Sequence, residues 1–154
     1  MIIDIAKLKE EPAAFQGAEP EDLLQLEAAA IARPAGPVSY DLLAQLAGRE
    51  LVVQGTLTVP LECTCGRCAE NFSTSLTISD FLRDFDLSDG RDSVDLTDDL
   101  REEVLLHLPN FPVCSSDCRG RCPRCGRNLN LGRCGCRARP QDLRWSGLDG
   151  LKLT

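Results

Sequence analysis

The sequence has few of the residues from which most catalytic sites are built. Its 154 residues include one histidine, one tryptophan, one tyrosine and one methionine, and aromatic residues make up 5% of the chain. Catalytic zinc sites usually combine histidine or carboxylate ligands with an open position for water, so the single histidine, His107, disfavours such a site. The chain also contains no phosphate-binding loop, dinucleotide-binding motif or nucleophile elbow. We therefore expect a protein that is not an enzyme and has no small-molecule substrate.

Long apolar segments are also missing. No stretch approaches the roughly 18 apolar residues that a membrane span needs. The first residues, MIIDIAKLKEEP, have neither the basic segment nor the long apolar segment of a signal peptide. We therefore expect a cytoplasmic protein with no membrane partner. In a reducing compartment, nine cysteines, an odd number, favour metal binding over a set of disulfides.

Six of the nine cysteines lie in one short stretch, from Cys114 to Cys136. Within it, CPRCG ending at Gly126 has the spacing of a zinc knuckle, in which a two-residue spacer lets both sulfurs reach one metal. The glycine permits the positive φ that this turn needs, with backbone N–H groups facing the sulfurs. A second pair follows eight residues later. These residues predict one four-cysteine zinc site, formed by Cys122, Cys125, Cys134 and Cys136.

The other cysteines allow two arrangements. Cys65 and Cys68 form a second Cys-x-x-Cys pair, and Cys114 and Cys118 are separated by three residues. Together they would make a second zinc site that joins parts of the chain about 50 residues apart. Alternatively, the first pair is free and the second pair shares the C-terminal metal. We favour two structural zinc sites, and we expect Cys63 to be a buried, reduced thiol.

An iron–sulfur cluster is a rival to zinc. The spacing of Cys118, Cys122 and Cys125 is that of the cluster ligands in radical S-adenosylmethionine enzymes. Such enzymes need a larger sheet or barrel to bind the cosubstrate than this chain offers. The additional pair, Cys134 and Cys136, also suits zinc better, so we expect zinc.

Charge divides the chain into two parts. Residues 1–113 contain eight Lys/Arg and 21 Asp/Glu, which gives a net charge of −13. Residues 114–154 contain nine Lys/Arg and three Asp/Glu, which gives a net charge of +6. We expect an acidic body over 1–113 and a cysteine-rich zinc-binding module over 114–154 whose tail packs on the body. Each zinc with four thiolates carries a charge of about −2, which offsets much of the positive charge. Candidate contacts to RNA phosphates are Arg119, Arg121, Arg124, Arg127, Arg133, Arg137 and Arg139.

Alternating apolar residues predict a long antiparallel hairpin over residues 50–85, with Cys65 and Cys68 at its tip. Gly55 lies at a strand position that faces the core, so we expect it at a β-bulge or where another backbone segment approaches closely. Residues 2–5 predict a short edge strand. The buried face of the strand before the hairpin is defined by Val38, Tyr40 and Leu42. The buried faces of the two hairpin strands are defined by Leu51, Val53, Leu57, Val59 and Leu61, and by Phe72, Leu76, Ile78, Phe81 and Phe85.

Two segments favour helix. Thr97 is a candidate N-cap for a helix near 97–108 with the stripe Leu96, Leu100, Val104 and Leu108, which Pro109 ends. Residues 20–31 begin as a helix does, but their alternation leaves an extended conformation open. Trp145 is expected to anchor the tail on the body. The predicted fold class is α+β, a curved antiparallel β-sheet or partial barrel with a few helices and a C-terminal zinc-knuckle module.

Four motifs resemble, in the same order, those of the YceD-like family, the large ribosomal RNA subunit accumulation proteins of bacteria and plastids. They are VPLECTCGRCAENF, LLHLPNFPVC, CRGRCPRCGRNLNLGRCGC and DLRWSGLDGLK, and the resemblance covers roughly residues 50–152. It implies that Cys65 and Cys68 match the family's Cys-x-Arg-Cys tip and that Cys63 lies outside its cysteine pattern.

The same resemblance implies a role in the synthesis, processing or stability of large-subunit (23S) ribosomal RNA. It implies ribosomal RNA or ribosome-assembly proteins as partners. The alternative is a protein-interaction adaptor in ribosome assembly, in which the acidic residues 84–103 bind a basic protein and the zinc is purely structural.

Overall fold

The structure is a computed structural model that describes residues 1–8, 11–26 and 30–136. Arg137, Arg139 and the tail with Trp145 lie outside the described residues. None of the helices in the described part of the chain has the length and apolarity that crossing a bilayer requires. The elements are β1 (Ile2–Asp4), the 3₁₀ turn η1 (Ile5–Lys7), β2 (Ala13–Glu19), the 3₁₀ turn η2 (Glu21–Leu24), β3 (Ala32–Pro34), β4 (Val38–Ala47), β5 (Glu50–Thr64), β6 (Asn71–Asp86), β7 (Ser93–Asp95) and α1 (Thr97–His107).

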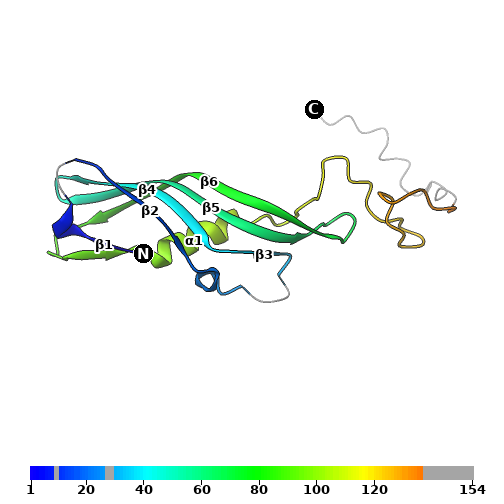
Figure 1. Ribbon diagram of the computed structural model, residues 1–154, viewed down its shortest axis with the longest axis horizontal. Coiled ribbons are helices and arrows are strands. Elements are labelled where there is room, and N and C mark those ends of the chain that lie inside the picture. Colours follow the sequence, from blue (N-terminus) through cyan, green and yellow to red (C-terminus); the bar gives the residue numbers. More distant parts are fainter. Residues whose placement is uncertain (9–10, 27–29, 137–154) are drawn as a thin grey trace, which may run out of the picture.

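The main sheet is antiparallel and is organised around β5. One edge of β5 pairs with β4 and then with the short β3, and its other edge pairs along its length with β6; β2 completes the sheet beside β4. The sheet is open rather than closed into a barrel (Figure 1). The predicted mainly antiparallel fold is therefore confirmed, with one α-helix among the described residues where a few helices were expected.

Alternation places the core on one face of this sheet. The five apolar residues predicted to point inward from β5, from Leu51 to Leu61, are all buried. The register between β5 and β6 shifts between Gly55 and Leu57, so the predicted bulge is confirmed. A Cβ atom at Gly55 would meet the carbonyl oxygen of Asp41 and the Cα atom of Leu42, which explains why a glycine is needed there.

The inner face is covered by α1, η2 and the small sheet formed by β1 and β7 (Figure 1). Leu100 and Val104 of α1 and its N-cap residue Leu96 enter the core, as the predicted stripe requires. Thr97 is the first helical residue rather than the N-cap. Its backbone N–H donates to the carboxylate of Asp95 at 3.0 Å, so an acid two residues earlier provides the cap that was assigned to the threonine.

The N-terminal third holds most of the differences from the sequence analysis. The edge strand at residues 2–5 is present as β1. The start of the 20–31 segment is a single 3₁₀ turn, η2, which ends where Gln25 takes a left-handed conformation with φ 47°. The strand β2 was not predicted, because its residues, AAFQGAE, have only one large apolar side chain.

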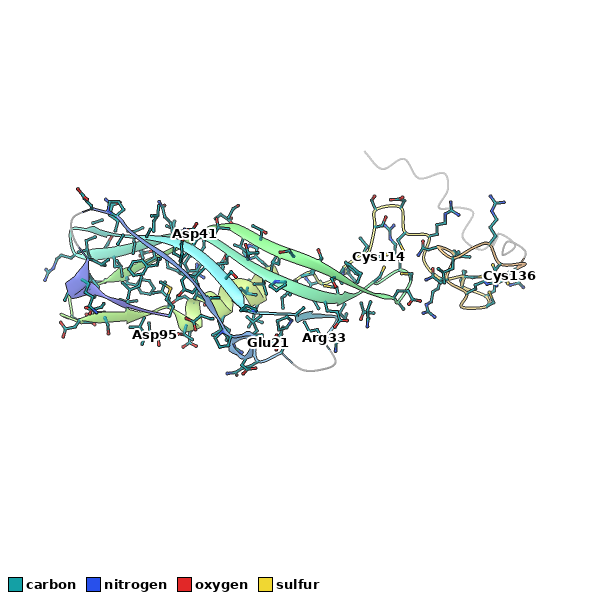
Figure 2. All side chains as sticks on the ribbon, in the orientation of Figure 1. Glu21, Arg33, Asp41, Asp95, Cys114 and Cys136 are labelled. Atoms are coloured by element: carbon teal, nitrogen blue, oxygen red, sulfur yellow. The ribbon has the colours of Figure 1, made fainter. Side chains whose placement is uncertain are left out.

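The β5–β6 hairpin brings its tip to the cysteine-rich segment. Residues 108–113 lead from the end of α1 to this tip, where the backbone N–H of Gly66 donates to the carbonyl of Pro112 at 2.8 Å. Figure 2 shows Cys114 beside the hairpin and Cys136 farther from the sheet. The sheet and linker thus place two segments that are distant in sequence next to each other.

Candidate metal centre

Four sulfur atoms from two parts of the chain meet at the hairpin tip. The Sγ atoms of Cys65, Cys68, Cys114 and Cys118 all lie within 4.8 Å of one another. The Sγ atoms of Cys65 and Cys118 are 3.8 Å apart, as are those of Cys68 and Cys114. That separation is far above the roughly 2.05 Å of a disulfide. It matches the spacing of about 3.8 Å between tetrahedral ligands that each lie about 2.3 Å from a zinc ion.

The turn at the tip gives the first two cysteines this geometry. The backbone N–H of Ala69 donates to the carbonyl of Cys65 at 2.8 Å, and Ala69 has a left-handed φ of 56°. Hydrogen bonds from the backbone N–H groups of Cys68 and Cys114 lower the pKa of Cys65 to about 6. The backbone therefore favours a thiolate, the form that binds a metal.

The pKa values of the remaining two cysteines in this group, Cys114 and Cys118, shift in opposite directions. A hydrogen bond from the side-chain amide of Asn130, at 3.3 Å, lowers the pKa of Cys118. Hydrogen bonding with Cys118, followed by burial, raises the pKa of Cys114 to about 12. Four thiols at this distance cannot all ionise on their own, since each thiolate disfavours the next. A divalent cation would remove that conflict, so the donor set fits a metal.

A second group is formed within a short stretch of chain. The Sγ atoms of Cys122, Cys125, Cys134 and Cys136 lie within 4.8 Å of one another. Backbone N–H groups of Cys125 and Arg124 lower the pKa of Cys122 to about 6. A hydrogen bond with Cys125, followed by burial, raises the pKa of Cys136 to about 12. The second group thus repeats the electrostatic pattern of the first.

The turn between Cys122 and Gly126 in the second group has the same geometry as the turn at the hairpin tip. The backbone N–H of Gly126 donates to the carbonyl of Cys122 at 2.9 Å, and Gly126 has a φ of 72°. The positive φ predicted for this glycine is confirmed. Ala69 occupies the equivalent position at the hairpin tip, where an L-residue takes the same conformation at some cost in strain.

The structure thus joins the hairpin pair to Cys114 and Cys118, and it leaves these two out of the C-terminal group. It also separates Cys118 from Cys122 and Cys125, the three residues whose spacing resembles that of iron–sulfur ligands. Each group has room for one ion at its centre rather than for a cluster of several irons and sulfides. Metal binding by the eight cysteines remains a prediction.

Cys63 lies outside both groups. Its side chain is 1% exposed and packs in the main core, and burial raises the pKa of its thiol. All nine cysteines are free thiols in the structure. Cys63 is therefore buried in the core of the sheet, as predicted.

Among the residues predicted to contact RNA, Arg121 makes contacts that stabilise the fold. Its Nε donates to the carbonyl of Cys68 at 2.6 Å, and its Nη2 pairs with Glu70 at 3.3 Å. From the opposite side, Arg67 donates to the carbonyl of Ser116 at 3.1 Å. These contacts attach the module to the hairpin tip. Arg119, Arg124, Arg127 and Arg133 have exposed side chains on the module.

Polar residues that the sequence patterns do not single out support the first group. Asn130 donates to the sulfur of Cys118 and accepts from the backbone N–H of Arg119 at 2.8 Å. Glu70 accepts from Asn128 at 3.3 Å as well as from Arg121. The asparagines in NLNLG were a detectable signal, because they alternate with leucines in a segment that has almost no core.

Comparisons with known proteins match both the module and the whole chain. A family model described as "Large ribosomal RNA subunit accumulation protein YceD" matches residues 82–152. An uncharacterized protein of Mycobacterium tuberculosis and one of Mycobacterium bovis are each 30% identical over 167 aligned positions, which cover 96% of this chain and 79% of the relative. The match to an uncharacterized protein of Mycobacterium leprae, at 28% identity, covers 60% of this chain and 49% of that protein.

A chloroplastic protein of Arabidopsis thaliana, "Large ribosomal RNA subunit accumulation protein YCED homolog 1", is 32% identical over 59 residues, or 38% of this chain and 18% of its own length. No solved structure gives a significant match. The family model begins after the hairpin tip, so it includes Cys114 and Cys118 but not Cys65 and Cys68.

Proposed function

The chain belongs to the YceD-like family, and we propose on that basis that it is a non-enzymatic, zinc-binding factor supporting the synthesis, processing or stability of large-subunit (23S) ribosomal RNA. The observation that carries the proposal is the family match, which runs through the linker and includes all six cysteines of the cysteine-rich module. We further propose that it acts in the cytoplasm, where reduced thiols persist.

The proposed metal content is two structural zinc ions. Soft thiolate ligands suit zinc, and four thiolates fill its tetrahedral coordination, which leaves no position for a catalytic water. The two groups of four cysteines, each within 4.8 Å, support this assignment. The zinc ions would hold the module in shape and attach it to the sheet.

The proposed RNA contacts are made through exposed arginines of the module. Arg119, Arg127 and Arg133 are exposed, whereas Arg121 holds the hairpin tip and is better assigned to the fold. A guanidinium on a rigid, metal-held loop contacts phosphates without reading base sequence. Arg124 is exposed as well, and Arg137 and Arg139 remain candidates outside the described residues.

The test is the triple variant Arg119→Gln/Arg127→Gln/Arg133→Gln, measured by filter binding to a large-subunit ribosomal RNA fragment. We expect the slope of log affinity against log salt to fall in magnitude by about 3, roughly one for each lost phosphate contact. The matched control, Lys7→Gln/Arg49→Gln/Arg91→Gln, removes the same charge from the body and should leave that slope close to wild type. Circular dichroism and metal content should be unchanged in both.

Binding that does not depend on salt, or that the control variant weakens equally, would count against these contacts. A second readout is the amount of 23S ribosomal RNA in cells that express only the variant. Full RNA accumulation despite lost RNA binding would favour the second candidate, an adaptor with purely structural zinc. The acidic residues 84–103 favour that candidate, and nuclease treatment of pull-downs separates RNA-mediated partners from direct ones.

A further inference from the structure

One face of the main sheet has no covering element among the described residues. The core and α1 lie on the inner face, whereas the outward side chains of β4 and β6 are exposed. Two large apolar side chains lie on this outer face, Leu43 at 43% exposure and Leu82 at 55%. In the sheet register Leu43 is opposite Gln54, and Gln54 is opposite Leu82. The two leucines therefore flank one glutamine in a single row across three strands.

This row lies where the outer face is hollowed. A hollow of about 450 Å³ is bounded by Leu43, Leu82, Asp41 and Asp80 among others, and an adjoining one of about 210 Å³ is bounded by Leu43 and Val52. They share Leu43 and Gln54 and form one shallow groove, in which apolar side chains surround this glutamine, running from the β5 bulge toward the β4–β5 turn.

Acidic side chains border the middle of this groove, and the β4–β5 turn toward which it runs contains the exposed Arg49. The strands β2 to β6 contain only two basic residues, Arg33 and Arg83. Arg83 points to the inner face, where its Nη2 pairs with Glu103 at 2.7 Å. Arg33 is at the far end of the sheet and pairs with Glu62 at 2.9 Å. The exposed carboxylates of Asp41 and Asp80 border the larger hollow, and the exposed Asp84 is opposite Val52 of the smaller hollow in the sheet register.

We propose that this outer face, centred on Leu43 and Leu82, is a docking surface for a basic protein segment that carries apolar residues between its lysines or arginines. Leucine side chains would bury the apolar part, and the three aspartates would attract the cations. Nucleic acid fits poorly here, because its phosphates would meet carboxylates. The proposal goes beyond the proposed function and needs neither zinc nor the module arginines.

The probe is a synthetic nonapeptide of alternating lysine and leucine, measured by fluorescence anisotropy with the full chain. The variant Asp41→Asn/Asp80→Asn/Asp84→Asn should weaken its binding about tenfold, as expected for three exposed charge pairs. Asparagine at position 41 keeps a partner for Gln16, whose amide donates to Asp41 at 3.1 Å. The matched control, Asp92→Asn/Asp98→Asn/Glu102→Gln, changes net charge equally and should alter binding less than about twofold.

Leu82→Ser should also weaken the peptide's binding, whereas Leu106→Ser, at a helix position that is 71% exposed, should not. Amide NMR shifts on addition of the peptide should centre on Leu43, Gln54 and Leu82. A matching nonapeptide of glutamate and leucine should not bind.

Several results would overturn the proposal. These are an absence of binding at millimolar peptide, equal weakening by both charge variants, or NMR shifts confined to other surfaces. A dimer that Leu82→Ser dissociates would make a second copy the occupant. Binding only after removal of residues 137–154 would assign the face to the protein's own tail. Loss of ribosomal RNA binding in the aspartate variant would make it an RNA surface. Metal content and salt-dependent RNA binding report on the proposed function separately.

Discussion

The two cysteine groups have the same chemistry but different positions in the chain. The first joins Cys65 and Cys68 of the hairpin to Cys114 and Cys118, with contacts that span 53 and 46 residues of sequence. Three of its four cysteines are buried. The second group lies within residues 122–136, and only Cys122 is buried. One group connects two parts of the fold, whereas the other organises a single loop.

This difference in position predicts a difference in what each metal stabilises. Metal in the first group would close a long loop and attach the module to the sheet, in addition to the contacts of Arg67 and Arg121. Metal in the second group would order only its own short segment. Substituting one cysteine in one group at a time therefore distinguishes the attachment of the module to the sheet from the local folding of residues 122–136.

The largest effect is expected from Cys65→Ser, which removes a ligand of the first group. A metal present at a thousandfold excess over its dissociation constant stabilises the folded state by about 4 kcal/mol. Its loss should speed amide hydrogen exchange about a thousandfold at the hairpin tip and across residues 114–121 together. Hydrogen-exchange mass spectrometry measures this.

Cys63→Ala is the matched control for that experiment. It removes a buried thiol two residues away, so the core should lose some stability while both metals and the attachment of the module are retained. Equal deprotection of the module in both variants would show that the cysteine pairs do not form the attachment.

A smaller effect is expected from Cys134→Ser. This variant should lose one metal, and its faster hydrogen exchange should be confined to residues 122–136. The hairpin tip and the thermal midpoint of the sheet should remain as in the wild type, because the first group keeps its four ligands. Deprotection that spreads to the hairpin tip would mean that the groups fold as one unit.

The smallest effects are expected at the two equivalent turn positions. Gly126→Ala should weaken the second site by about 1 kcal/mol, because an L-residue is strained at its φ of 72°. Ala69→Gly should strengthen the first site by about 0.5 kcal/mol, since relief of strain exceeds the added entropy of the unfolded chain. Metal competition with a chromophoric chelator measures both, and changes of the same sign would contradict the shared turn geometry.

Local patterns were sufficient to predict the regular part of the fold. Alternation from Leu51 to Leu61 gave β5 and its buried face, and the glycine at position 55 marked the bulge. The stripe that begins at Leu96 gave α1. Elements with weak signals were missed, such as β2, whose stability comes from pairing with β4 rather than from its own side chains.

For the site, the sequence predicted two sets of four cysteines, and the structure brings the same sets together. The roles of individual arginines were not accessible in this way. Arg121 and Arg124 have the same local pattern, yet Arg121 holds the hairpin tip because the fold brings Cys68 and Glu70 beside it. Such a role depends on tertiary contacts that span about 50 residues, which no local pattern encodes.

We propose that each cysteine group binds its own metal ion. Native mass spectrometry of the purified full chain, with Cys65→Ser and Cys134→Ser measured beside it, tests this most directly. We expect two zinc ions in the wild type and one in each variant. A single ion in the wild type, loss of both ions in either variant, or the mass of an iron–sulfur cluster would contradict it.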